Sequence, residues 1–199
     1  MKKLLCLTFI CLTVFACKKD DDNNTTAPTT PTTTALSIGD TYQGGIIFYL
    51  DSNGGGLIAA PIDQSTGAQW GCYGTTISGA YGTTIGTGAQ NTVDIDSLCT
   101  TAGTAADICA NLTLGGYSDW FLPSKDELNL IWTNLADSDG DGSNNGPSDP
   151  NNLGGFANYI YWSSTNYVQD GAWVQSFING YQHLNLKDVN DYVRAVRAF

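Results

Sequence analysis

The sequence predicts an α+β domain with antiparallel strands, preceded by an N-terminal segment that is not globular. Apolar runs bounded by Gly, Asn and Asp turns stand near both ends of residues 38–199, and segments with helical spacing stand between them. The 23 glycines among 199 residues favour turns and short strands over long helices. Strands at both ends with helices in the middle are typical of the α+β class.

Residues 1–16 have the pattern of a bacterial lipoprotein signal peptide. Two lysines precede an apolar stretch, Leu4–Phe15, that is shorter than the ~20 residues a helix needs to span a bilayer. Val14–Cys17 resembles a lipobox, in which a small residue precedes the cysteine that takes up diacylglycerol. We therefore expect lipid attachment at Cys17 and stable anchoring, because several acyl chains insert together. An ordinary secretory signal is the alternative.

Residues 17–37 are expected to form the acylated cysteine and a tether. Lys19 is followed by Asp20, Asp21 and Asp22, which resembles a signal for export to the outer face of the outer membrane. We expect display on the cell surface, with the periplasmic face as the alternative. The Thr- and Pro-rich stretch that follows cannot bury enough apolar surface to offset its ordering entropy, so we expect a semi-extended spacer.

The charge of the chain argues against nucleic acid as a partner. There are 8 Lys and Arg against 19 Asp and Glu, and the net charge is −11. Binding to nucleic acid needs clustered basic side chains that neutralise phosphates.

The first predicted elements of the domain are two strands, 44–51 and 57–61, which flank a Gly- and Asn-rich turn and form a hairpin. Residues 73–85 contain two copies of Tyr-Gly-Thr-Thr-Ile and are expected to be an irregular loop. Two short helices follow, 91–99 and 104–112.

A longer helix is predicted over residues 124–136. Ser124 and Glu127 have the spacing of a capping box, and Asp126 adds a favourable charge in the first turn. Apolar residues at i, i+3, i+4 and i+7 form a stripe that faces the core: Leu128, Ile131, Trp132 and Leu135. Four strands separated by turn signals complete the domain as an antiparallel meander, at 159–165, 172–177, 181–186 and 193–199.

Four segments in this order resemble the Lcl C-terminal domain family: Gly115–Leu128, Tyr161–Ser164, Ala172–Trp173 and Val193–Arg197. The resemblance covers about residues 44–199 and implies a C-type-lectin-like fold, with paired N- and C-terminal strands, two or three flanking helices and long loops. It supplies no catalytic residue. We therefore expect a surface lipoprotein with a non-catalytic, adhesion-type domain that binds a glycan or a surface protein.

Two alternatives stay open. The segment Leu122–Ser124 faintly resembles the fold of formylglycine-generating enzymes, so a degenerate enzyme of that type is one alternative. A structural component of the envelope is the other. His183 is the only histidine, and no nucleophile motif accompanies it, so we expect no enzyme and place this histidine on a strand surface.

The loop after the long helix has the spacing of a calcium site. Oxygen-bearing side chains stand at loop positions 1, 3, 5, 7 and 9, with glycine at position 6. Position 12 is Ser148 instead of the bidentate glutamate, and nearby prolines exclude an exiting helix, so Asp149 would substitute. The predicted calcium ligands are Asp137, Asp139, Asp141, Ser143, Asn145 and Asp149. A solvated acidic loop is the alternative.

Three cysteines follow the lipid-attachment site: Cys72, Cys99 and Cys109. An exported domain favours disulfides. We expect a Cys99–Cys109 bond, because two short helices joined by a turn bring such residues within ~6 Å. A bond from Cys72 to either of the others is the alternative.

Aromatic residues divide into two groups. Those in the family-like segments are expected in the core: Trp120, Trp132, Trp162 and Trp173. Those in loops or turns beside polar residues are the candidates for a ligand face: Tyr73, Tyr81, Tyr167 and Tyr181.

Overall fold

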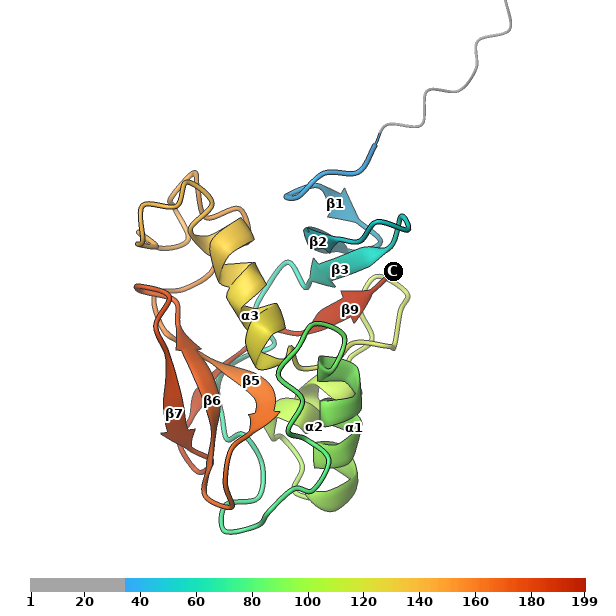
Figure 1. Ribbon diagram of the computed structural model, residues 1–199, viewed down its shortest axis with the longest axis vertical. Coiled ribbons are helices and arrows are strands. Elements are labelled where there is room, and N and C mark those ends of the chain that lie inside the picture. Colours follow the sequence, from blue (N-terminus) through green and yellow to red (C-terminus); the bar gives the residue numbers. More distant parts are fainter. Residues whose placement is uncertain (1–34) are drawn as a thin grey trace, which may run out of the picture. The chain divides into compact units, whose positions relative to one another are not determined.

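Two β-sheets and three α-helices make up residues 35–199, the part of the chain that the computed structural model describes (Figure 1). The first sheet has the order β1-β2-β3-β9, with bounds Thr41–Tyr42, Gly45–Leu50, Gly56–Ala59 and Val196–Ala198. The second has the order β4-β8-β5-β6-β7, with bounds Ser65–Ala68, Asp191–Val193, Ile160–Asn166, Gly171–Ser176 and Gln182–Leu186. The predicted α+β class is confirmed. The predicted signal peptide, Cys17 and the tether up to residue 34 lie outside the described residues.

β2 and β3 form the predicted hairpin, and Asp51 closes the turn between them. Its Oδ1 accepts hydrogen bonds from the N–H groups of Asn53 and Gly55, at 2.7 and 2.9 Å. β9, from the other end of the chain, pairs antiparallel with β3, so that Ile58 lies opposite Arg197. Strands from the two ends of the domain are therefore neighbours, as the family resemblance implies.

The prediction of one strand over 193–199 is wrong, because the chain divides there between the two sheets. β5, β6 and β7 do form an antiparallel meander. The last segment does not extend it: β8 pairs parallel with β5 through Tyr161 and Tyr192, and β9 belongs to the first sheet. β1 and β4 were not predicted. β4 has the sequence Ser-Thr-Gly-Ala, which lacks the apolar alternation of a strand.

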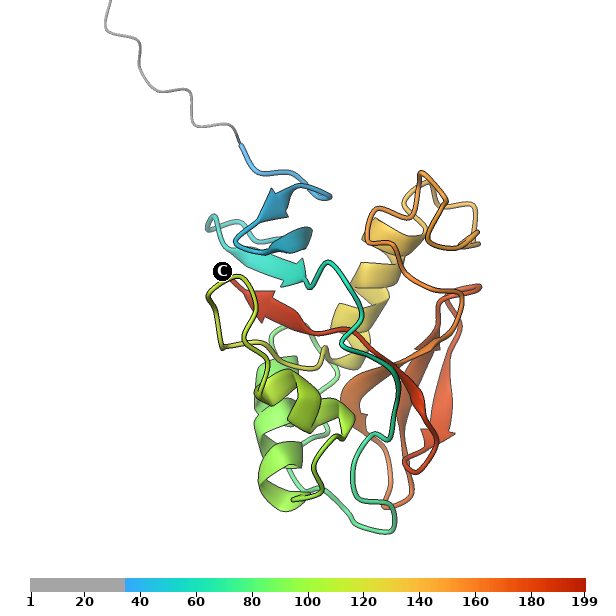
Figure 2. The same cartoon turned by 180° about the vertical axis from the view of Figure 1, so that it is seen from behind.

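The two segments that pass between the sheets run side by side (Figure 2). One leads from β3 to β4 and the other from β8 to β9, and the N–H of Ala60 donates to the carbonyl of Ala195 at 2.9 Å. Arg194 Nε contacts Asp63 Oδ1 at 2.8 Å, and the Arg194 side chain is only 1% exposed. Its Nη1 donates to the carbonyls of Ala60 and Gly154, at 2.8 and 3.0 Å. One buried guanidinium thus joins both crossing segments and a distant loop.

The three α-helices lie close to where the sequence predicts them. α1 (Gly88–Leu98) and α2 (Ala105–Ala110) pack against each other, and α1 also contacts β5. α3 (Lys125–Ile131) contacts β2 of the first sheet and β5 and β6 of the second, so it lies between the sheets (Figure 1).

A buried glutamate fixes the N-terminus of α3. Ser124 Oγ accepts from the N–H of Glu127 at 3.3 Å, and Glu127 Oε2 accepts from the N–H of Ser124 at 2.7 Å, so the predicted capping box is confirmed. Glu127 Oε1 also accepts from the N–H of Gly86 at 2.7 Å, which holds the loop before α1 against this helix. Burial raises the pKa of the Glu127 carboxyl, and the N–H donors oppose that shift.

The last turn of the predicted long helix is a π-helical turn, η1 (Trp132–Ala136). The N–H of Asp137 donates to the carbonyl of Trp132, five residues earlier, at 2.9 Å. Trp132 stands edge-on to Phe177, with ring centroids 5.7 Å apart, and the predicted apolar stripe is buried. The wide turn ends at Asp137, which is itself buried.

The predicted Cys99–Cys109 disulfide is wrong. Cys99 is bonded to Cys72, with Cα atoms 5.5 Å apart. Cys109 lies on the buried face of α2, where its thiol packs in the apolar core and burial raises its pKa. Cys99 follows the last residue of α1 in an extended conformation. It is therefore free to bond to the irregular loop that contains Cys72, a contact that helix spacing does not reveal.

Replacing Arg194 by Met should lower the free energy of unfolding by about 3–5 kcal/mol, because Asp63 and two carbonyls lose a buried partner. The matched control is Arg197→Met: Arg197 pairs with Asp119, whose side chain is 62% exposed, so we expect a loss of about 1 kcal/mol. Urea unfolding measures both changes. Equal losses in the two variants would contradict the role given to Arg194.

Candidate functional site

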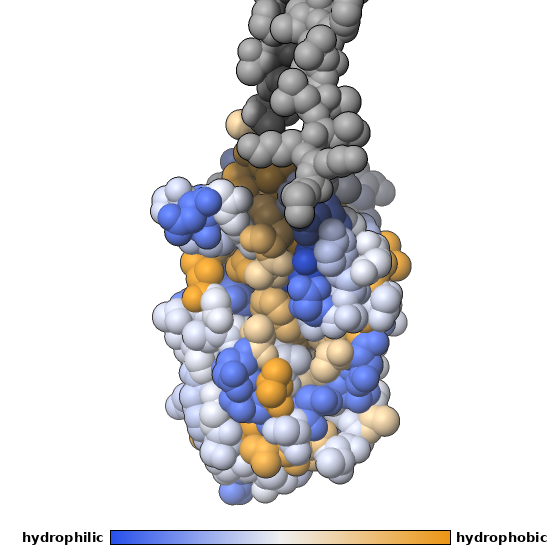
Figure 3. All heavy atoms as spheres, turned by 90° about the vertical axis from the view of Figure 1, so that its right-hand side faces the viewer, coloured by the Kyte–Doolittle hydropathy of each residue, from blue (hydrophilic) through white to orange (hydrophobic). Residues whose placement is uncertain are grey.

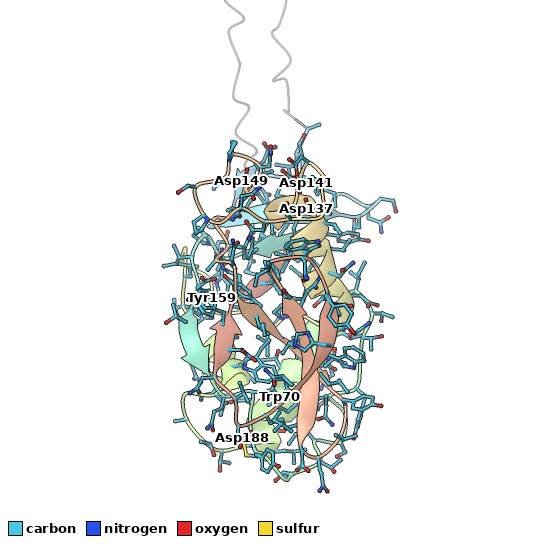
Figure 4. The ribbon with its side chains drawn as sticks, turned by 90° about the vertical axis from the view of Figure 1, so that its left-hand side faces the viewer. Trp70, Asp137, Asp141, Asp149, Tyr159 and Asp188 are labelled. Atoms are coloured by element: carbon cyan, nitrogen blue, oxygen red, sulfur yellow. A yellow bond between two sulfur atoms is a disulfide. The ribbon has the colours of Figure 1, made fainter. Side chains whose placement is uncertain are left out.

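Two places in residues 35–199 gather groups suited to binding: an acidic loop after η1 and an apolar depression beside β7. The acidic loop lies at one end of the domain, where Figure 4 places Asp137, Asp141 and Asp149. No helix follows it before β5, as the prolines in the sequence predict. The loop therefore differs from a helix–loop–helix calcium site in its exit.

The carboxylates of the first three predicted calcium ligands converge. One oxygen from each of Asp137, Asp139 and Asp141 lies within 4.8 Å of the others. Burial raises the pKa of Asp137, and the negative charges of Asp141 and Asp139 add to that effect. The N–H of Gly142 donates to both oxygens of Asp137, at 3.2 Å each, and opposes the shift. A divalent cation here would relieve the repulsion among the three carboxylates.

The other three predicted ligands are engaged in bonds within the loop. Ser143 Oγ donates to Asp141 Oδ1 at 2.7 Å, and Asn145 Nδ2 donates to Asp149 Oδ2 at 3.0 Å. The N–H of Asn151 donates to the other oxygen of Asp149 at 2.9 Å. This bond and the one from Asn145 lower the pKa of Asp149. The structure thus brings together the carboxylates of three of the six predicted ligands, whereas Ser143 bonds to Asp141, and Asn145 and Asp149 bond to each other.

Two buried asparagines shape this loop, and neither was predicted. Asn152 Nδ2 donates to the carbonyl of Phe156 at 2.7 Å and to Asn144 Oδ1 at 3.0 Å. Asn144 Nδ2 donates to the carbonyl of Phe177 at 3.0 Å. In the sequence these residues look like any other asparagine of a polar loop, so no pattern marks them. Their bonds give the acidic turn a fixed scaffold.

The second place is an apolar depression of about 240 Å³ beside β7, which is the outermost strand of the second sheet. Four of its apolar side chains are 40–50% exposed. Exposed apolar side chains that gather in this way mark interaction surfaces more often than isolated ones do. We refer to these four as the β7 face: Tyr167, Val168, Leu184 and Leu186. Asp170, Gly171 and Asn185 complete the lining.

Of the four predicted ligand tyrosines, Tyr167 lines this depression and stands edge-on to Trp173, with ring centroids 6.0 Å apart. Tyr181 precedes β7 and stacks on the ring of His183 at 5.7 Å. Tyr73 and Tyr81 lie in the loop before α1 and are about half exposed. The leucines of the β7 face were missed. The alternating sequence of residues 182–186 signals an amphipathic strand, but it does not show that the strand is outermost.

A second depression, also about 240 Å³, lies beside α1 and α2. Figure 3 looks at this side of the domain, where apolar side chains interrupt the polar surface. Val93, Trp120 and Phe121 line the depression together with Asp119. The Asp119 carboxylate already accepts from Arg197, so the polar group here is largely satisfied within the protein.

Several buried titratable groups of the described domain have structural partners. Lys187 lies 4.6 Å from the centre of the Trp70 ring and donates to the carbonyl of Thr75 at 2.9 Å, and burial lowers its pKa to about 8. Tyr161 Oη donates to Asp63 Oδ2 at 3.1 Å, and burial raises its pKa. These groups stabilise loops and strand crossings, and neither lines a depression.

The fold and these surfaces define an α+β domain with paired terminal strands and long displayed loops. The model of the Lcl C-terminal domain family matches residues 60–197, and the chain belongs to this family. A search of curated proteins found no match. Among residues 35–199, no helix is both long enough and apolar enough to cross a membrane.

Calcium should bind to the acidic loop with measurable heat and should raise the Tm, because an ion that binds only the folded state stabilises it. Asp141→Asn should remove both effects. Asp188→Asn, an exposed change in a different loop, should leave them intact. Calorimetric titration and melting curves in Ca²⁺ and in EDTA measure the difference. No heat and an unchanged Tm for the wild type would refute the site.

Proposed function

We propose that the protein is an outer-membrane lipoprotein, attached through Cys17 and displayed on the cell surface, whose Lcl C-terminal domain binds a ligand without catalysis. The anchoring rests on the sequence of residues 1–22. The binding rests on one observation above the others: four apolar side chains line an open depression beside an outermost strand.

The position of the β7 face supports this proposal. The described chain starts beside β1, whereas β7 runs toward the opposite end of the domain (Figure 1). The β7 face therefore belongs to the second sheet, whereas the first strand after the proposed tether belongs to the first sheet. A surface in that position is suited to contact with something outside the cell.

The chemistry of the depression favours a protein over a glycan. Sugar hydroxyls need many hydrogen-bonding partners, but most of the lining is apolar, and its polar side chains come from Asp170, Asn185 and the hydroxyl of Tyr167. Apolar side chains of a partner protein would fill such a surface well.

The non-catalytic part of the proposal is supported by the state of the cysteines. An enzyme of the formylglycine-generating type would need reactive thiols. In the described domain Cys72 and Cys99 are joined, and Cys109 is fully buried with its pKa raised by burial. A thiol in that environment is inert.

A fatty-acid probe supplied to growing cells should label the wild-type protein, because the thiol of Cys17 is the proposed acceptor. Cys17→Ser should abolish the label and release the protein into the soluble fraction. Cys11→Ser, within the predicted signal, should keep it. Gel fluorescence after labelling gives the answer, and protease treatment of intact cells then separates surface display from the periplasmic face. An unlabelled wild type would refute the anchor.

A glycan array probed with the purified protein should show no signal that depends on Leu184, because the β7 face suits apolar protein side chains. The array is read for the wild type and for Leu184→Lys, each with and without EDTA. A signal lost in Leu184→Lys would keep the site but assign it to a sugar. A signal lost in EDTA and kept in Leu184→Lys would move ligand binding to the acidic loop.

A further inference from the structure

We propose that the partner of the β7 face is a second copy of this chain, and that two β7 strands pair antiparallel about Leu184. This inference rests on the proposed binding role of the β7 face and names its occupant.

β7 differs from the other strands at sheet edges. β1 has two residues, and β4 is polar and has a register shift against β8. β9 is covered, because Val196 and Phe121 exchange two backbone hydrogen bonds of 2.8 Å. β7 has five residues, pairs with β6 without a register shift and carries no charge or proline. Proteins usually protect sheet edges with charges, prolines or bulges, because an open edge pairs with other strands.

The hydrogen bonds on either side of β7 show which groups are open. The N–H of Ser176 donates to the carbonyl of Tyr181, and that of Lys187 donates to the carbonyl of Asp170, both at 2.9 Å. In an antiparallel pair the direction alternates along the strand. The backbone groups of residues 181, 183, 185 and 187 therefore face β6, and those of residues 182, 184 and 186 face outward.

Two of these three outward residues have open backbone groups. At Leu186 the N–H donates to Asn185 Oδ1 at 3.0 Å, and the carbonyl accepts from the N–H of Val189 at 3.1 Å. Within the described domain, no hydrogen bond is formed by the backbone N–H or carbonyl of Gln182 or Leu184. The open edge is thus short and centred on an exposed leucine.

A second β7 fits this edge by symmetry. A closed pair of identical chains uses a two-fold axis, and two strands related by an axis perpendicular to them run antiparallel. With the axis at Leu184, each Leu184 exchanges two backbone bonds with its copy, and Gln182 lies opposite Leu186. The exposed leucines of both copies then meet on one face of a continuous sheet, as cross-strand pairs do within a sheet.

Among the approaches open to two copies, pairing through β7 is the one that charge opposes least. The chain has a net charge of −11, so two copies repel each other over most approaches. Residues 181–186 contain no Asp, Glu, Lys or Arg, and strand pairing there brings no carboxylate of β7 against another. Because salt screens the remaining repulsion, salt should strengthen the pair.

The pairing also fixes the orientation of the two copies relative to each other. Since β7 runs away from the end where the described chain starts (Figure 1), antiparallel strands place the two chain starts at opposite ends of the pair. If each copy is anchored as proposed, the two anchors continue from opposite ends of the pair, and we infer a link between facing membranes.

Hydrogen exchange of the purified full chain in detergent, at low and high protein concentration, tests the pairing. The amide of Leu184 should exchange about ten- to a hundredfold more slowly when concentrated, the range expected for the two hydrogen bonds that the Leu184 pair adds. Leu184→Lys should remove this protection. Leu98→Lys, a change of another exposed leucine, at the end of α1, should keep it. Sedimentation velocity should show a dimer in the wild type and in Leu98→Lys only.

Protection that does not depend on concentration, or that survives in Leu184→Lys, would overturn the pairing. Vesicles that carry the wild-type lipoprotein should cluster, and those that carry Leu184→Lys should not. A chain that dimerises without clustering vesicles would overturn the facing arrangement. Failure of the fatty-acid label would refute the anchor alone, because the exchange experiment does not depend on it.

Discussion

The fold depends on a single buried ion pair at the place where the chain changes sheets. Arg194 lies between β8 and β9, and Asp63 lies between β3 and β4. Both crossings lie outside the regular strands, and their buried backbone carbonyls need donors. The guanidinium supplies them, to Ala60 and Gly154, and it also stacks 4.1 Å from the ring of Phe156. It joins the long loop before β5 to the strand crossings, together with the bonds that run from the N–H of Ala157 through the hydroxyl of Tyr161 to Asp63.

The other basic side chains of the domain are also engaged in contacts within the protein. Four basic residues follow residue 34, and each lies over an aromatic ring: Lys125 on Trp173, Lys187 on Trp70, Arg194 on Phe156 and Arg197 on Tyr117. Cation–π contacts and burial occupy these charges inside or against the protein. The surface potential is therefore set mainly by carboxylates. Such a surface repels polyanions. It suits a cation at the acidic loop or a short-range apolar contact at β7.

The sequence predicted elements whose signals are local. The capping box of Ser124 and Glu127 and the hairpin turn at Asp51 depend on residues within a few positions, and both are present. The errors concern long-range choices. The partner of Cys99 lies 27 residues away in an irregular loop. The last strand divides because β8 pairs with β5 and β9 pairs with β3, and the sequence of residues 191–199 does not show which strands these segments pair with. At the candidate sites, the spacing of the aspartates in the acidic loop was visible in the sequence, whereas the exposure of Leu184 follows from the order of the strands in the sheet.

An open edge strand is a hazard as well as an interface, and the domain limits that hazard in two ways. Only two residues of β7 have open backbone groups, because the turn after Leu186 satisfies the third. An edge this short allows one strand to pair but does not provide the long ladder that drives continued aggregation. The acidic charge then raises the cost of any approach that brings carboxylates together. The short open edge and the acidic charge together permit a short, symmetric contact between uncharged backbone groups. Such a contact suits a pair that forms reversibly.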